Sequence, residues 1–247
     1  MSPHREHDTD LGGGGSRFPR TRHSAIVAAR ADDPLARKEA WETISAAYWK
    51  PVYAYVRARW KLSNDDAQEL TQDFLLRAFE KSFFSAYDAS KGTFRTFLRT
   101  CLDRHVAHEL ESRSRQKRGG DRGHVDIDEH TTAPGDPELE RLFHREWVRG
   151  LFEHALEELR TACERTGKQR VFAMFQRYDV EGPDASLAPT YAALAAEHGV
   201  PVTQVTNDLA WARREFKARV RARLRVICTD DDEFEAESRA LLGEERA

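Results

Sequence analysis

The chain has 247 residues, 40% hydrophobic and 33% charged, with a mean hydropathy of −0.71. No apolar run is long enough to span a bilayer, and residues 1–20 lack the apolar core of a signal peptide. The cysteines at 101, 163 and 228 are far apart and form no CxxC pair, which argues against a disulfide framework or a zinc site. The composition predicts a cytoplasmic, mostly helical protein with no membrane contact and with neither metal nor cofactor.

Acidic residues are concentrated in two segments, although the formal net charge of the whole chain is only −3. Residues 121–140 and residues 229–247 each carry −6, so the rest of the chain carries +9. A polyanion such as nucleic acid is a natural partner for the basic remainder.

The first part of the chain predicts a helical bundle. Residues 1–20 contain four consecutive glycines and are expected to be a disordered leader. Helices are expected over residues 24–31, 34–59 and 65–81. Pro51 marks a candidate bend in the second helix, and Ser63 and Asn64 suit the start of the third. The third helix has a buried apolar face and a polar, mainly acidic opposite face.

A basic helix is expected within residues 93–120. Its apolar stripe includes His105, while Arg95, Arg99 and Arg104 lie off that stripe. Residues 91–122 carry +5. Arginines that alternate with threonine and aromatic residues suit phosphate contact beside unstacked bases.

The second part of the chain follows an acidic linker at 121–137, which is expected to be flexible. Asp136-Pro137-Glu138 starts a second helical bundle. One helix is expected directly after this tripeptide, and a further helix is expected over residues 167–178. The fold class expected is therefore all-α, with two small bundles joined by the linker and a helix-turn-helix at the end of the second.

The helix-turn-helix is expected within residues 189–225. Leu194 and Ala195 lie on a short apolar helix, Gly199 can adopt the positive φ of a turn, and a longer helix resumes at Thr203. Polar side chains crowd the start of this longer helix, where they can hydrogen-bond base edges in a major groove. Residues 203–225 carry +5, which suits a phosphate backbone.

The chain resembles a bacterial RNA polymerase sigma factor of the extracytoplasmic-function (ECF) type. The resemblance is carried by four stretches in the family's order: YWKPVYAYVRAR, DDAQELTQDFLLRAFE, GTFRTFLRTCLDRHVAHELESRSRQKRGG and PTYAALAAEHGVPVTQVTNDLAWARREF. It implies a region 2-like domain at 21–120 and a region 4-like domain at 138–226. The acidic linker and the acidic tail at 227–247 have no counterpart in the minimal family pattern, and the tail is a candidate to screen the basic helix in the free protein.

The resemblance implies a non-enzymatic protein that binds core RNA polymerase, through the clamp of its largest subunit and its flap, and directs it to promoter DNA. An anti-sigma or other regulatory protein is a further partner that the family implies. The core-binding set is Asp66, Glu69, Gln72, Asp73 and Arg77. The −10 set, which opens the promoter, is Arg95, Arg99, Arg104, His108, Arg113, Arg115, Lys117 and Arg118. The −35 set is Thr203, Gln204, Thr206, Asn207, Arg213, Arg214 and Lys217.

Two other functions compete with this interpretation. An autonomous helix-turn-helix repressor or activator would bind a palindromic duplex without polymerase, with its first domain binding a ligand or dimerising. A metal-dependent enzyme would use His105, His108 and Glu109, but their order is not HExxH and the sequence shows no distal cluster to complete a metal shell.

Overall fold

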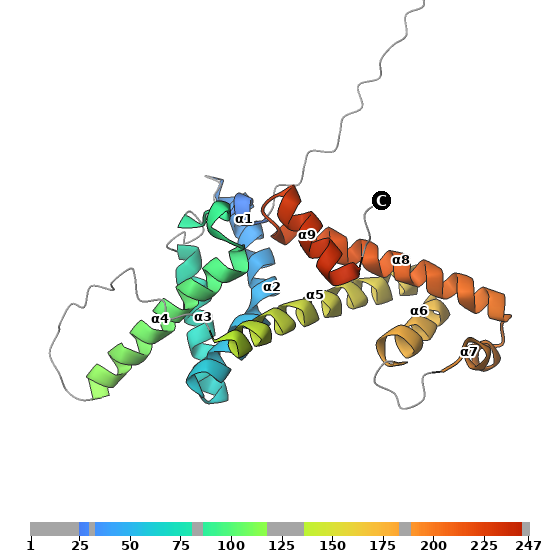
Figure 1. Cartoon of the computed structure of the whole chain (residues 1–247), viewed down its shortest axis with the longest axis horizontal. Helices are drawn as coiled ribbons and strands as arrows, with labels where there is room; N and C mark the ends of the chain where they lie inside the picture. The colour runs from blue at the N-terminus through green and yellow to red at the C-terminus, as the bar shows by residue number, and fades with distance from the viewer. Residues whose placement is uncertain (1–24, 30–32, 81–85, 118–135, 183–188, 244–247) are drawn as a thin grey trace, which may run out of the picture.

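The computed structural model describes residues 25–29, 33–80, 86–117, 136–182 and 189–243. All regular elements in these ranges are helical, which confirms the all-α fold (Figure 1). They are α1 (Ala25–Ala28), α2 (Pro34–Trp60), α3 (Asn64–Glu80), the 3-10 turn η2 (Ala89–Lys91), α4 (Phe94–Lys117), α5 (Pro137–Arg165), α6 (Gln169–Phe175), the π turn η3 (Gln176–Val180), α7 (Tyr191–His198), α8 (Val202–Ile227) and α9 (Asp231–Leu242). None of the described helices combines the length and apolar character needed to cross a membrane. The expected leader and nearly all of the expected linker lie outside the described residues.

Two long helices begin where the sequence signals place them. At the start of α2, the Asp33 carboxylate accepts a hydrogen bond from the Leu35 amide at 3.0 Å. At the start of α5, the Asp136 carboxylate accepts one from the Glu138 amide at 2.9 Å. Both helices have proline as their first residue, where its missing N–H removes no helical hydrogen bond. Local capping chemistry therefore fixes both starts.

Helix α2 lies at the centre of the larger hydrophobic cluster. Its stripe of Ile44, Tyr48, Val52 and Tyr55 is buried against α3, α4 and α5. Pro51 is also buried and does not interrupt α2, which is one helix to Trp60. The aromatic stripe is thus part of the core, as its helical spacing indicates.

The described residues form two hydrophobic clusters, but these do not divide at the acidic linker. The first cluster contains α1 to α4 together with Trp147 of α5 and Leu224 of α8. The second contains Leu159 of α5 and Leu209 of α8 with α6 and α7. Figure 1 shows α5 and α8 running side by side between the two parts of the molecule. Two bundles connected only by a linker are therefore not confirmed, because two continuous helices pass through both clusters.

A short helix, a turn and a long helix follow one another in the second cluster. The Thr190 hydroxyl accepts a hydrogen bond from the Ala193 amide at 3.1 Å and starts α7. Gly199 ends α7 with a φ of 64°, a conformation that favours glycine, and α8 begins at Val202. These helices lie where the sequence predicts them, and their use in reading DNA stays a prediction.

The acidic tail contains a helix that sequence analysis did not predict. The Asp230 carboxylate caps α9 by accepting from the Glu233 amide at 2.8 Å, while the Glu233 side chain accepts from both the amide and the hydroxyl of Thr229. Phe234 of α9 is buried in the first cluster. The acidic composition of the tail indicates only its charge. The capping residues Asp230 and Glu233 and the buried Phe234 decide that it forms a helix packed on the first cluster.

Candidate nucleic-acid interface

The first two turns of α8 present hydrogen-bonding side chains to solvent. Val205 and Leu209 of this segment are buried against α6 and α7, so the polar residues between them face outward. The exposed polar members of the −35 set are Thr203, Gln204, Thr206 and Asn207. The Gln204 amide donates to Asp208 at 2.7 Å, and the Thr206 hydroxyl donates to the Val202 carbonyl at 3.1 Å. This end of α8 can offer amide and hydroxyl groups to the edges of bases.

The basic members of the −35 set are held differently from one another. The Arg213 Nε lies 3.0 and 3.1 Å from the two carboxylate oxygens of Asp179, and its Nη1 donates to the Tyr191 hydroxyl at 3.3 Å. Arg214 and Lys217 are both exposed, and Lys217 lies where α9 approaches α8. Arg213 therefore ties η3 and α7 to α8, whereas Arg214 and Lys217 are presented to solvent.

The first two arginines of the −10 set are mostly buried. Arg95 pairs with Glu237 of α9 and lies over the Trp147 ring, 4.1 Å from its centroid. Arg99 pairs with Glu140 of α5 at 2.5 Å. Only 17% and 15% of the two arginine side chains is exposed. Both lie off the apolar stripe, as the spacing predicts, but α5 and α9 bring carboxylates to them from distant parts of the chain.

Arg113, in the last turns of α4, contacts two members of the core-binding set on α3. Its guanidinium lies 3.0 Å from the Glu69 carboxylate and 3.9 Å from that of Asp66. Two sets that the sequence assigned to different partners therefore meet across the α3–α4 contact.

The other members of the −10 set lie along the outer side and the end of α4. Arg104 and His108 are exposed, and Arg115 pairs with Glu111 at 3.0 Å. Lys117 ends α4, but its side chain is outside the described part of the structure, as is all of Arg118.

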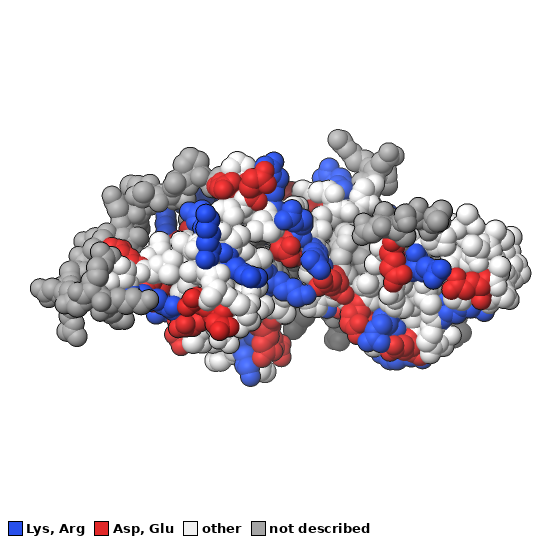
Figure 2. Space-filling model, turned by 90° about the horizontal axis from the view of Figure 1, so that it is seen from below, with Lys and Arg blue, Asp and Glu red and all other residues white. Residues whose placement is uncertain are grey.

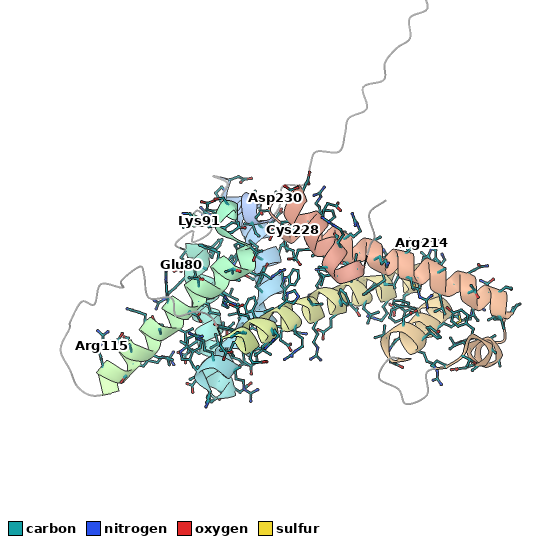
Figure 3. The ribbon with its side chains drawn as sticks, viewed as in Figure 1. Glu80, Lys91, Arg115, Arg214, Cys228 and Asp230 are labelled. Atoms are coloured by element: carbon teal, nitrogen blue, oxygen red, sulfur yellow. The ribbon has the colours of Figure 1, made fainter. Side chains whose placement is uncertain are left out.

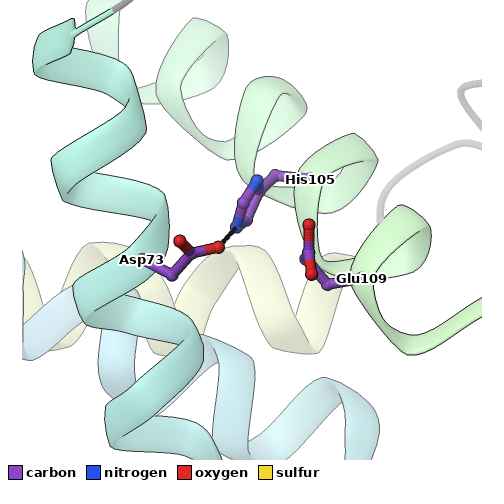
Figure 4. Close-up of side chains that lie close together, drawn as sticks. All are labelled: Asp73, His105 and Glu109. Carbon is purple, nitrogen blue, oxygen red and sulfur yellow. Dashed lines mark ion pairs between the residues drawn. The ribbon is translucent and has the colours of Figure 1, made fainter. Parts of the chain in front are cut away.

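Helices α3 and α4 share a further ion-pair network. The Asp73 carboxylate lies 3.1 Å from the His105 Nε2 (Figure 4). The same carboxylate lies 3.1 Å from the Arg77 Nε, and the Arg77 Nη1 lies 2.9 Å from Glu109. The His105 nitrogen is close to Asp73 without meeting the geometry of a hydrogen bond. Burial lowers the pKa of His105, and the Asp73 carboxylate only partly opposes that shift. Arg77 is thus the main cation between the two acids.

The same network is the group of side chains best suited to a metal among the described residues. Donor atoms of Asp73, His105 and Glu109 all lie within 4.8 Å of one another. Asp73 supplies a carboxylate from a distant helix, which the sequence did not reveal. His108 is not part of the group: its side chain is exposed and its Nδ1 lies 3.6 Å from Glu109. The Arg77 guanidinium already bridges both carboxylates, so the geometry fits an ion-pair network better than a metal shell.

One exposed apolar residue beside the core-binding set was missed in the sequence. Leu76 is 55% exposed and follows the exposed Gln72 by one turn of α3. The signal is the run Phe74-Leu75-Leu76, since three consecutive residues of a helix cannot all face one core. The outer face of α3 therefore combines polar and apolar groups.

The acidic partners of the arginines in the −10 and −35 sets were not predicted from the sequence. Glu140, Asp179 and Glu237 come from three elements distant in sequence from the arginines they hold. On the face that Figure 2 shows, acidic side chains lie beside the basic ones, and a large part of the surface carries neither.

Comparison with protein-family models, with curated proteins and with solved structures finds no match to this chain.

Proposed function

We propose that the chain is a sigma factor of the ECF type, which binds core RNA polymerase in the cytoplasm and directs promoter recognition and transcription initiation. The proposed role is non-enzymatic, because neither promoter contact nor strand opening needs a covalent nucleophile. Polymerase is the catalyst, and promoter DNA is the second partner.

The observation that carries this proposal is the exposed polar start of α8. Amide and hydroxyl side chains stand there in two successive turns, directly after α7 and the Gly199 turn. A recognition helix contacts base edges with residues near its N-terminus while basic residues further along contact phosphates. Arg214 and Lys217 are exposed basic residues further along α8.

The separation of the two basic regions also supports the proposal. Arg115 near the end of α4 and Arg214 on α8 lie toward opposite ends of the long axis (Figure 3). Two promoter elements that are separated along the DNA need two separated contact surfaces. Opening the promoter element at one of these surfaces costs a few kcal/mol for each unstacked base. Capture of the extruded bases by the protein offsets that cost.

Two surfaces support contact with polymerase. The outer face of α3 presents Gln72 and Leu76, a mixture of polar and apolar groups typical of protein interfaces. A groove of about 880 Å³ between α5, α6, η3 and α8 is lined by Phe152, Leu156, Phe175, Val180 and Phe216 and by charged residues that include Arg213 and Lys217. We assign the clamp to the first surface and the flap to the second.

The test uses two exposed glutamines as crossed controls. Gln72→Ala should weaken capture of core polymerase about tenfold and leave sequence preference unchanged, because Gln72 lies on α3, away from α8. Gln204→Ala should leave capture unchanged and alter sequence preference at one promoter position. Pull-down with purified core and in vitro transcription on a promoter library measure the two effects.

Each outcome discriminates between functions. No association with core and no initiation from any template would refute the proposal. Tight binding of a palindromic duplex by the chain alone, unchanged by core, would instead support an autonomous helix-turn-helix regulator. Gln72→Ala with full affinity for core would remove α3 from the polymerase interface.

A further inference from the structure

Helix α9 lies along the second half of α8 and also reaches the start of α4 (Figure 1). Its sequence, DDEFEAESRALL, contains five acidic residues and one basic residue. The link between the helices is short, from Cys228 to Asp230 (Figure 3). An acidic helix is therefore held at high effective concentration beside the most basic helix of the chain.

Three cations on one face of α8 contact α9. Lys217 donates to the Leu242 carbonyl at 3.4 Å, Arg221 lies 3.4 Å from the Glu235 carboxylate, and Arg225 pairs with Asp231. Lys217, Arg221 and Arg225 are spaced by four residues, so they form a row with a spacing of about 6 Å along the helix. Of these, only Lys217 belongs to the −35 set.

A fourth cation comes from the −10 set. Arg95 of α4 pairs with Glu237, and 11% of that glutamate side chain is exposed. Helix α9 thus touches cations of both α4 and α8, although these two helices are far apart in sequence. Its carboxylates occupy positions that phosphate oxygens could take, because both are anionic acceptors for arginine and lysine.

Phe234 anchors this arrangement. It is 6% exposed and lies beneath two guanidinium groups, with Arg225 4.3 Å and Arg221 4.9 Å from its ring centroid. The aromatic face therefore attracts the same arginines that the carboxylates pair with. Removal of this ring would weaken docking of α9 without changing the charge of the chain.

We propose that Lys217, Arg221, Arg225 and Arg95 form a phosphate-binding surface for nucleic acid, and that α9 covers this surface in the free chain. The choice of nucleic acid as the competing partner rests on the proposed function. Nucleic acid and α9 exclude one another, so binding of DNA releases α9 and docking of α9 weakens DNA binding.

The contacts of α9 suit a reversible cover. The carboxylates of Glu235 and Asp231 are 52% and 82% exposed, so solvent and salt screen their ion pairs. The mostly buried Arg95–Glu237 pair is harder to separate and favours the docked state. Ser238 is fully buried, and its hydroxyl has no hydrogen-bond partner among the described residues. A buried hydroxyl without a partner penalises the docked state. Docking is therefore weaker than it would be with that hydroxyl paired.

The experiment measures binding of a fluorescent 25-base-pair duplex of arbitrary sequence to the full-length free chain at low salt. Phe234→Ala should tighten binding about tenfold, because it frees α9 at unchanged net charge. Ser238→Ala should weaken binding about twofold, because it removes the penalty on docking. Amide hydrogen exchange in α9 should rise when the duplex is added to the wild-type chain.

Two variants separate release of α9 from a general charge effect. Glu235→Gln and Asp232→Asn each remove one negative charge from α9, but only Glu235 pairs with a cation of α8. Glu235→Gln should tighten binding about threefold more than Asp232→Asn does. Equal effects of these two variants, with no change for Phe234→Ala, would overturn the proposal. If thermal melting shows that Phe234→Ala does not fold, two other measurements test the proposal. These are the weaker DNA binding expected of Ser238→Ala and the rise in amide hydrogen exchange of α9 when the duplex is added.

Failure of this inference is distinguishable from failure of the proposed function. The duplex measurement contains no polymerase, whereas the sigma-factor test depends on core capture and initiation. Capture of core with no effect of Phe234→Ala on DNA affinity would reject the cover alone. Tighter DNA binding by Phe234→Ala without any core capture would retain the cover and reject the sigma factor.

Discussion

The α4 basic region and the start of α8 carry similar expectations from sequence but differ in the structure. Arg95, Arg99 and Arg113 each pair with a carboxylate from another helix, whereas Gln204 and Asn207 are exposed. These three arginines of α4 are already paired within the chain, whereas the polar start of α8 faces solvent. A basic segment and an available basic surface are therefore separate properties, because net charge along the sequence does not register acids that folding brings near.

The ion pairs of α4 raise the free-energy cost of binding DNA there. DNA that approaches α4 must compete with carboxylates, and each exposed pair contributes only about 0–1 kcal/mol, so competition is feasible at the surface. Buried pairs such as Arg95–Glu237 are harder to separate because both charges must be rehydrated or paired anew. At the start of α8 a base edge competes with the Gln204–Asp208 hydrogen bond rather than with an ion pair.

The largest expected effect tests whether the two regions fold together. Phe74 is fully buried in the first cluster, so Phe74→Ala should lower the free energy of unfolding by about 3–5 kcal/mol in denaturant titration. Because α5 and α8 pass through both clusters, hydrogen exchange should also accelerate in α7. Leu76→Ala, at a 55% exposed position, is the control and should change stability by about 0.5 kcal/mol or less. Unchanged exchange in α7 would show that the second cluster folds independently.

A smaller effect should separate base reading from phosphate contact at the open region. Asn207→Ala in the holoenzyme should cost about 1–3 kcal/mol on the preferred promoter and little on other sequences. Arg214→Ala should weaken binding to all sequences and reduce the salt slope by about 1. Arg213→Ala should instead lower thermal stability, since it removes the contacts to Asp179 and Tyr191. Identical binding profiles for all three variants would contradict the assigned roles.

The smallest expected effect is the pH dependence of stability that His105 of α4 contributes. The folded chain holds His105 with a lowered pKa because of burial, so the unfolded chain takes up a proton first as the pH falls. Stability should be fully present above about pH 6.5 and should decline below it, with a slope from this residue of at most about 1.4 kcal/mol per pH unit.

The variant His105→Asn should lose that part of the pH dependence in denaturant titrations between pH 7.5 and 5. His108→Asn changes an exposed histidine on the same helix and serves as the control. An unaltered pH profile in His105→Asn would place the titration elsewhere, His144 being the next candidate because burial lowers its pKa as well.

Local signals allowed much of the fold to be predicted. The stripe along α2, the Asp-Pro starts of α2 and α5 and the glycine after α7 are short-range patterns, and each has a direct physical cause in spacing, capping or backbone freedom. The exposed polar start of α8 was predictable for the same reason, since the helical period places Val205 inward and its neighbours outward.

The helical character of the chain, the starts of most helices and the segments rich in acid or base follow from the order of its residues. Which charges meet depends on the packing of the helices. Asp73 lies against His105, Glu237 lies against Arg95, and α9 lies along α8 because burial of Phe74 and Phe234 brings these elements together. The physical reason is that propensity and capping act over a few residues, whereas the partner of a side chain depends on how distant apolar faces pack.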